Sequence, residues 1–100
     1  MAAISPSSYA APLTNIVTGF GDIAGDNSTL RLNGSQVAVA TGDQGAGNFG
    51  SYPLFIGSRN NASLFLNGNI YSIIVVGSAV SAGQISATEQ WVAGKVGITI

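Results

Sequence analysis

Residues 29–39 have the sequence TLRLNGSQVAV, and this stretch decides the fold. Two runs rich in apolar residues flank the dipeptide Asn33-Gly34. That dipeptide suits the positive φ angles required at both central positions of a type I′ turn. The sequence therefore predicts a β-hairpin with a two-residue turn at Asn33 and Gly34.

The register of this hairpin follows from counting outward from the turn. Three cross-strand pairs are predicted: Leu32 with Ser35, Leu30 with Val37, and Ser28 with Val39. Because side chains alternate along a strand, one face of the hairpin is then apolar and the other is wetter. The apolar face carries Leu30, Leu32, Val37 and Val39, and the wetter face carries Thr29, Arg31, Gln36 and Ala38.

Further strands are predicted on both sides of the hairpin, because short apolar runs broken by Gly, Asn, Asp and Ser are typical of all-β sandwiches and barrels. Residues 13–23 predict a strand with a bend or bulge near Gly19, ending in the turn-forming cluster 25–28. Residues 52–57 predict a strand start or edge strand, since its second residue is proline. Its expected partner is 64–76, which is apolar on both faces and therefore belongs in the middle of a structure.

A helix is predicted at the end of the chain. Ser81 and Gln84 have the spacing of a capping box, and apolar residues then recur at helical spacing, which predicts a helix over about 82–93. Gly94 suits the left-handed residue that ends such a helix, and Lys95 suits the negative end of its dipole. Residues 1–12, rich in Ala, Ser and Pro without periodicity, are predicted to be a leader that is either poorly ordered or a lone edge strand.

Charged residues are scarce: the chain has three Lys or Arg, four Asp or Glu, no His and no Cys. Three cations cannot form the basic surface that binds nucleic acid. A net charge of −1 leaves exposed strand edges poorly guarded against association, which indicates a chain that works in an assembly. The longest aliphatic run, 73–76, is far too short to cross a bilayer, so a soluble protein is expected.

Three motifs occur in an order that resembles a known family. They are PLFIGSR at 53–59, FxNGxIxxI at 65–73 and VSxxQI at 80–85, followed by the closing helix. This arrangement resembles the C-terminal half of concanavalin A-like (laminin-G-like) jelly rolls. Within that family it is most similar to domains of tail and other virion proteins of tailed phages. The resemblance covers roughly residues 12–100.

The resemblance implies an all-β fold over residues 13–100: an antiparallel β-sandwich, a partial jelly roll, with one short C-terminal α-helix. A complete sandwich of this family needs two full sheets, whereas this chain supplies about six predicted strands. The N-terminal part of the family's domain is expected to be missing. The chain is therefore expected to be a fragment of a larger protein or to be completed by another copy of itself.

Two kinds of binding site are considered. Aromatic, amide and guanidinium groups in neighbouring loops could hold a sugar ring: Asn48, Phe49, Tyr52, Arg59, Asn60 and Asn61. The alternative is core packing for the two aromatic residues and a solvated turn for residues 59–61. The family resemblance suggests calcium at a loop rim, for which the available carboxylates are Asp22, Asp26 and Asp43. The favoured alternative is that each aspartate stabilises its own turn.

Catalysis is not expected. Many glycanases share the family's fold, but hydrolysis needs two carboxylates flanking the scissile bond. Glu89, the one glutamate, falls on the predicted helix and away from the concave face of a sheet. Without histidine no Ser-His-Asp arrangement exists.

We therefore predict a non-catalytic structural or interaction module of a tail-type phage virion protein, made in the host cytoplasm and located in the virion. The alternative is a carbohydrate-binding, lectin-like module. Expected partners are other virion subunits or the missing half of the sandwich, with a glycan in the alternative case. Neither nucleic acid nor membrane is expected as a partner, and calcium is the one cofactor considered.

Overall fold

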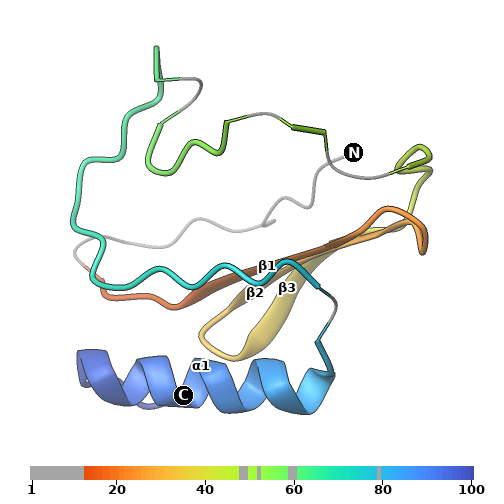
Figure 1. Ribbon diagram of the computed structural model, residues 1–100. Coiled ribbons are helices and arrows are strands. Elements are labelled where there is room, and N and C mark those ends of the chain that lie inside the picture. The colour runs from red at the N-terminus through yellow and green to blue at the C-terminus, as the bar shows by residue number, and fades with distance from the viewer. Residues whose placement is uncertain (1–12, 48–49, 52, 59–60, 79) are drawn as a thin grey trace.

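The computed structural model describes residues 13–47, 50–51, 53–58, 61–78 and 80–100. Along the described chain the elements are β1 (Val17–Asp22), β2 (Asn27–Leu32), β3 (Ser35–Ala40) and α1 (Ala82–Val96). The strands form one antiparallel sheet in the order β1-β2-β3. Figure 1 shows α1 lying across one face of this sheet. The coarse prediction of antiparallel strands followed by a helix is confirmed, and no second sheet is found in the described ranges.

The predicted hairpin turn is confirmed. Asn33 and Gly34 have φ angles of 49° and 85°, the positive pair of a type I′ turn, and Leu32 pairs with Ser35 as predicted. The Asn33 side chain also holds the start of β1. Its Oδ1 accepts from the Ile16 N–H at 2.8 Å, and the backbone N–H of Asn33 donates to the Ile16 carbonyl at 2.8 Å. The turn therefore fixes the neighbouring strand as well as its own hairpin.

The rest of the predicted register is wrong, because β3 contains a β-bulge. Arg31 pairs with Gln36, but the next pair is Leu30 with Ala38, so Val37 is the extra residue. An extra residue reverses the faces of everything beyond it. Val39, predicted opposite Ser28 on the Leu30 face, lies opposite Thr29 instead.

The bend or bulge predicted near Gly19 is also wrong. The ladder between β1 and β2 runs without interruption from Val17 opposite Leu32 to Asp22 opposite Asn27. Gly19 therefore sits in a regular strand, and the irregularity of the sheet lies in β3. The strand ends in a turn at residues 23–26, slightly earlier than the predicted cluster 25–28.

The capping box at the start of α1 is confirmed. Ser81 Oγ accepts from the Gln84 N–H at 3.2 Å, and Gln84 Oε1 accepts from the Ser81 N–H at 2.9 Å. The predicted end is wrong, because the helix continues through Gly94 to Val96 and the left-handed residue is Gly97, with φ 76°. The Ile98 N–H donates to the Ala93 carbonyl at 3.0 Å, which closes a Schellman-type end one turn later than predicted.

The last turn of α1 carries Lys95, as predicted for the negative end of the helix dipole. Its Nζ lies 4.5 Å from the ring centroid of Trp91, which is largely exposed. Within the described ranges, no helix has the length and apolar character needed to cross a membrane.

The strands predicted at 52–57 and 64–76 are not found in the described residues. Position 52 lies outside the described residues, and neither 53–58 nor 64–76 forms a strand. The two segments nevertheless meet, because the Leu66 N–H donates to the Gly57 carbonyl at 2.6 Å. Residues 70–76, called the 70–76 stretch below, run alongside β1 in the same direction (Figure 1). A sandwich is therefore a prediction that the described elements leave open. The leader predicted at 1–12 also lies outside the described residues.

Candidate functional site

The outer edge of β1 is the feature around which the candidate site is built. In the sheet, β1 pairs with β2 on one side and has no partner strand on the other among the described elements. A cavity of about 820 Å³ extends along residues 14–24, so it follows the full length of this strand. We call this cavity the slot. An unpaired strand edge presents a row of N–H and C=O groups that another extended chain can pair with.

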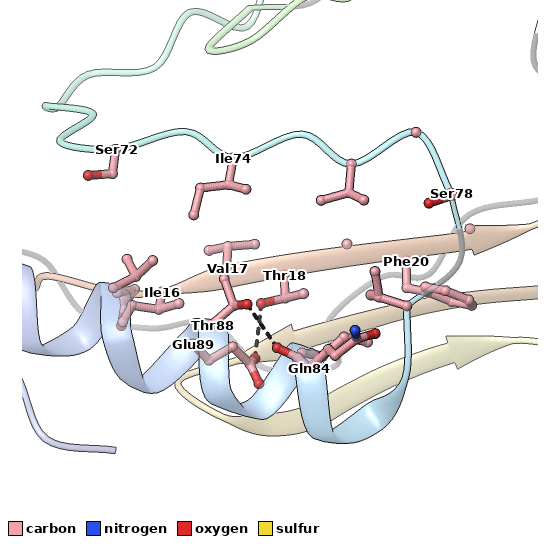
Figure 2. A pocket seen from close by; sticks show the side chains of 18 of the residues that line it. Ile16, Val17, Thr18, Phe20, Ser72, Ile74, Ser78, Gln84, Thr88 and Glu89 are labelled. Atoms are coloured by element: carbon pink, nitrogen blue, oxygen red, sulfur yellow. Dashed lines mark hydrogen bonds between the residues drawn. The ribbon is translucent and has the colours of Figure 1, made fainter.

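The slot lies between the 70–76 stretch and α1. Figure 2 shows Ser72 and Ile74 pointing from the stretch toward β1, with the helix on the opposite side of that strand. The helix contributes one face to the lining, formed by Gln84, Ile85, Thr88, Glu89, Val92 and Val96. Most of these groups are apolar or uncharged, which suits an uncharged extended chain better than an ionic ligand.

The 70–76 stretch has two different faces. Ile70, Tyr71, Ser72, Ile74 and Val76 line the slot, whereas Ile73 and Val75 do not and are 54% and 71% exposed. From Ser72 to Val76 the alternation follows the period of two expected of an extended chain. This part of the stretch therefore offers Ser72, Ile74 and Val76 to the slot and leaves Ile73 and Val75 on the outside.

A buried ion pair fastens α1 to the sheet beside the slot. Glu89 is 3% exposed at its side chain, and Arg31 of β2 is 23% exposed. Arg31 Nη2 lies 2.7 Å from Glu89 Oε1, and Arg31 Nε lies 3.1 and 3.0 Å from the two carboxylate oxygens. Thr18 Oγ1 of β1 donates to Glu89 Oε2 at 2.9 Å (Figure 2). One carboxylate thus joins the helix to two strands, in the bidentate geometry that gives the strongest pairs.

The electrostatics of this pair follow from its contacts. The hydrogen bonds from Arg31 hold the pKa of Glu89 below its ordinary value, against the opposing effect of burial, and the Thr18 hydroxyl acts in the same direction. The hydrogen bond to Glu89 raises the pKa of Arg31. Both groups are therefore charged at neutral pH. Both carboxylate oxygens are also occupied, so Glu89 serves as an anchor and has no free oxygen for proton transfer.

Glu89 lies on α1, as predicted, and its side chain faces the sheet. The helix covers the hairpin face that carries Arg31, the face predicted to be the wetter one. A signal for this was present in the sequence. The chain has a single glutamate and few cations. If the helix packs on the face of the hairpin that carries Arg31, the guanidinium is covered and needs a carboxylate partner.

The three aspartates considered for calcium each accept a hydrogen bond from a backbone N–H. Asp22 Oδ1 accepts from Gly25 at 3.0 Å, Asp26 Oδ1 from Gln44 at 2.9 Å, and Asp43 Oδ1 from Gly45 at 2.8 Å. Two of these bonds, those of Asp22 and Asp43, close local turns of the kind that aspartate favours. In the described part of the chain, no group of three or more acidic residues is close enough to hold a metal. Calcium binding stays a prediction.

The residues predicted for sugar binding lie largely beyond the described chain. Those outside the described residues are Asn48, Phe49, Tyr52, Arg59 and Asn60. Asn61 is described, is exposed and has a positive φ of 54°, as in a turn. Sugar binding at these residues therefore stays a prediction.

Comparison of the chain with family models, with curated proteins and with solved structures gave no match.

Proposed function

We propose that this chain is a non-catalytic structural and interaction module that joins other protein through the outer face of the 70–76 stretch and the neighbouring apolar segments. The observation that carries the proposal is a segment in which large apolar side chains are exposed and charged side chains are absent. Residues 61–78 contain no charged side chain, and the large apolar residues in this range stand exposed: Leu64, Phe65, Leu66, Ile70, Tyr71, Ile73, Ile74, Val75 and Val76.

Exposed apolar surface of this extent normally marks a protein interface. Burying such side chains contributes roughly 25 cal/mol for each Å² removed from water. The low net charge of −1 offers little electrostatic repulsion between neighbouring molecules. The burial of apolar surface and the weak charge repulsion between molecules therefore both favour an assembly that covers residues 61–78.

A non-catalytic role is supported by what the carboxylates do. The single glutamate is held in an ion pair, and each aspartate accepts a backbone hydrogen bond. A glycosidase needs two carboxylates facing a shared space, one of which must release a proton.

The setting of the proposal rests on the resemblance to concanavalin A-like domains of tailed-phage virion proteins. On that basis the partners are other virion subunits or the remaining strands of a sandwich. The exposed 70–76 stretch supports this reading, since a segment apolar on both faces is suited to lie between two layers.

The experiment is sedimentation velocity over a concentration series, comparing the parent with Val75→Lys. Val75 is 71% exposed and does not line the slot, so a lysine there leaves the described fold intact and puts a charge into the proposed interface. The parent should self-associate and the variant should shift toward monomer. Gln90→Lys, on the exposed surface of α1, adds the same charge elsewhere and should behave as the parent. A parent that stays monomeric at the highest concentration contradicts self-association through this face.

A further inference from the structure

We propose that Asn67-Gly68 is a site of spontaneous deamidation, at which the proposed interface acquires a negative charge while a chain remains unassembled. The dipeptide belongs to the motif FxNGxIxxI and lies between Leu66 and Ile70 of the exposed apolar segment. The role of the new charge rests on the proposed function, because the charge matters where residues 61–78 are covered by another molecule. The reaction itself depends on the local chain alone.

The reaction uses an asparagine side chain, the next backbone nitrogen and water. The Gly68 nitrogen loses its proton and bonds to Cγ of Asn67, while the bond from Cγ to Nδ2 breaks and Nδ2 leaves as ammonia. Water then opens the five-membered imide at either carbonyl carbon. The product is aspartate or, with one extra backbone carbon, isoaspartate, and both carry a carboxylate in place of the amide. Glycine favours the reaction because it has no Cβ beside the attacking nitrogen and its backbone bends freely.

The surroundings of Asn67 leave this reaction open. Asn67 and Gly68 are both exposed and lie outside the helix and the strands. Figure 1 shows residues 64–68 at the margin of the molecule, apart from the sheet and α1. In the described part of the chain, no hydrogen bond holds the Asn67 carboxamide or the Gly68 N–H. Water reaches both groups, and the carboxamide turns toward the Gly68 nitrogen without breaking a described hydrogen bond.

The other Asn-Gly dipeptide of the chain, Asn33-Gly34, provides an internal comparison. Its carboxamide is held at both heteroatoms: Oδ1 accepts from the Ile16 N–H at 2.8 Å, and Nδ2 donates to Asn15 Oδ1 at 3.0 Å. Both hydrogen bonds must break before Cγ of Asn33 can approach the Gly34 nitrogen, and each adds to the barrier. The same dipeptide is therefore fixed in the hairpin turn and reactive at Asn67.

The consequence is a charge in a segment that has none. Residues 61–78 contain no charged side chain, and conversion of Asn67 changes the net charge of the chain from −1 to −2, since one neutral amide becomes one carboxylate. Burying an unpaired carboxylate against apolar side chains is costly. In an assembled chain this segment is covered and less free to rotate, so assembly should slow the reaction. A copy that stays unassembled loses its ability to join, which makes Asn67 a chemical timer for assembly.

The chemical test is peptide mapping by mass spectrometry of dilute, monomeric protein during incubation at neutral pH. Trypsin cleaves after arginine and lysine, so the two Asn-Gly dipeptides fall in separate peptides, 32–59 and 60–95, and fragmentation locates each conversion. Asn67 should be converted at least about tenfold faster than Asn33, because two hydrogen bonds must break at Asn33 and a tenfold ratio corresponds to about 1.4 kcal/mol of barrier. Equal rates, or an Asn67 that keeps its amide, would overturn the site.

Gly68→Ala is the matched variant for the chemistry. The atoms nearest to a Cβ added at Gly68 are two Leu66 side-chain carbons at 3.9 Å, and Gly68 does not have a positive φ, so alanine fits without strain. The added methyl group hinders the attacking nitrogen. Conversion of Asn67 should therefore slow by about tenfold, which corresponds to a barrier higher by about 1.4 kcal/mol. An unchanged rate contradicts attack by the Gly68 nitrogen and would overturn the assignment.

Sedimentation velocity tests the consequence separately. Asn67→Asp should shift the association equilibrium toward monomer, whereas Gln90→Glu makes the same amide-to-acid change on the exposed surface of α1 and should behave as the parent. Parent protein aged as a monomer should lose association, and Gly68→Ala aged in the same way should keep it. Unchanged association of Asn67→Asp would overturn the timer. A parent that never associates refutes the proposed function and the timer with it, while fast conversion that depends on Gly68 still establishes the deamidation site.

Discussion

Replacing Glu89 with alanine should destabilise the fold more than any other single truncation on α1. The change removes the carboxylate that accepts from Arg31 and from Thr18 and leaves the guanidinium beside the sheet without its counter-charge. Arg31 keeps one hydrogen bond, from its Nη2 to the Gly34 carbonyl at 2.8 Å. The hydroxyl of Thr18 loses its acceptor.

The magnitude follows from the burial of the two partners. Breaking a fully buried ion pair from one side costs about 3–5 kcal/mol. Because the Arg31 side chain is 23% exposed, water partly solvates the abandoned charge. We therefore expect a loss of about 2–4 kcal/mol in the free energy of unfolding. Against a total of roughly 5–15 kcal/mol for a domain of this size, the variant should remain folded with a clearly lower midpoint.

The assay is equilibrium urea denaturation followed by circular dichroism of the helix, arranged as a double-mutant cycle. The four proteins are the parent, Glu89→Ala, Arg31→Ala and the double variant, with Gln90→Ala as a control on the exposed side of α1. The double variant should be less destabilised than the sum of the single variants, because removing both charges leaves neither unpaired. A Glu89→Ala loss below about 1 kcal/mol, the range of exposed pairs, would refute the role of this pair as the anchor of α1.

Three further predictions concern pH, the helix end and metal. Because the pKa of Glu89 is lowered in the folded state, the stability that Glu89 contributes is fully present above its ordinary pKa of 4.5 and is lost as the pH falls through its pKa in the folded protein. Urea midpoints should therefore drop in that acid range. Glu89→Gln should make the drop smaller. Gly94→Ala should raise the free energy of unfolding by up to about 1 kcal/mol, because Gly94 is inside the helix. Gly97→Ala should lower it by about 1–2 kcal/mol, because Gly97 has a φ of 76°. Equal effects of the two substitutions would contradict the helix end described above. Removing calcium with a chelator should leave the melting temperature unchanged, since the aspartates considered for calcium accept backbone hydrogen bonds; a drop would instead support the calcium prediction.

Local sequence signals predicted the parts of the fold that depend on local geometry. The type I′ turn at Asn33-Gly34 and the capping box at Ser81 and Gln84 both involve residues within three positions of each other. The bulge at Val37 could not be read in this way, because an extra residue in a strand leaves the apolar pattern ambiguous. The end of α1 was similarly ambiguous, since glycines stand at both 94 and 97 and tertiary packing of the last turn decides between them.

The candidate site was harder to predict because its parts are distant in sequence. Arg31 and Glu89 are 58 residues apart, and pairing them requires knowing which face of the sheet the helix covers. The 70–76 stretch was predicted to be apolar on both faces, and its composition is indeed that of a buried strand. The composition does not, however, determine which segment lies beside this stretch. The expected partner was the 52–57 segment, and the strand that runs beside it is β1.

The bulge in β3 makes the two margins of the sheet unequal. A bulge distorts the hydrogen-bonding row and twists that margin away from an incoming chain, so the β3 side is a poor template, whereas the β1 side is regular along its whole length. If strands of another molecule pair only with the β1 side of the sheet, the sheet cannot extend beyond two molecules. We therefore expect any association through the sheet to stop at a closed pair, and this built-in asymmetry protects an almost uncharged chain from growing into fibres.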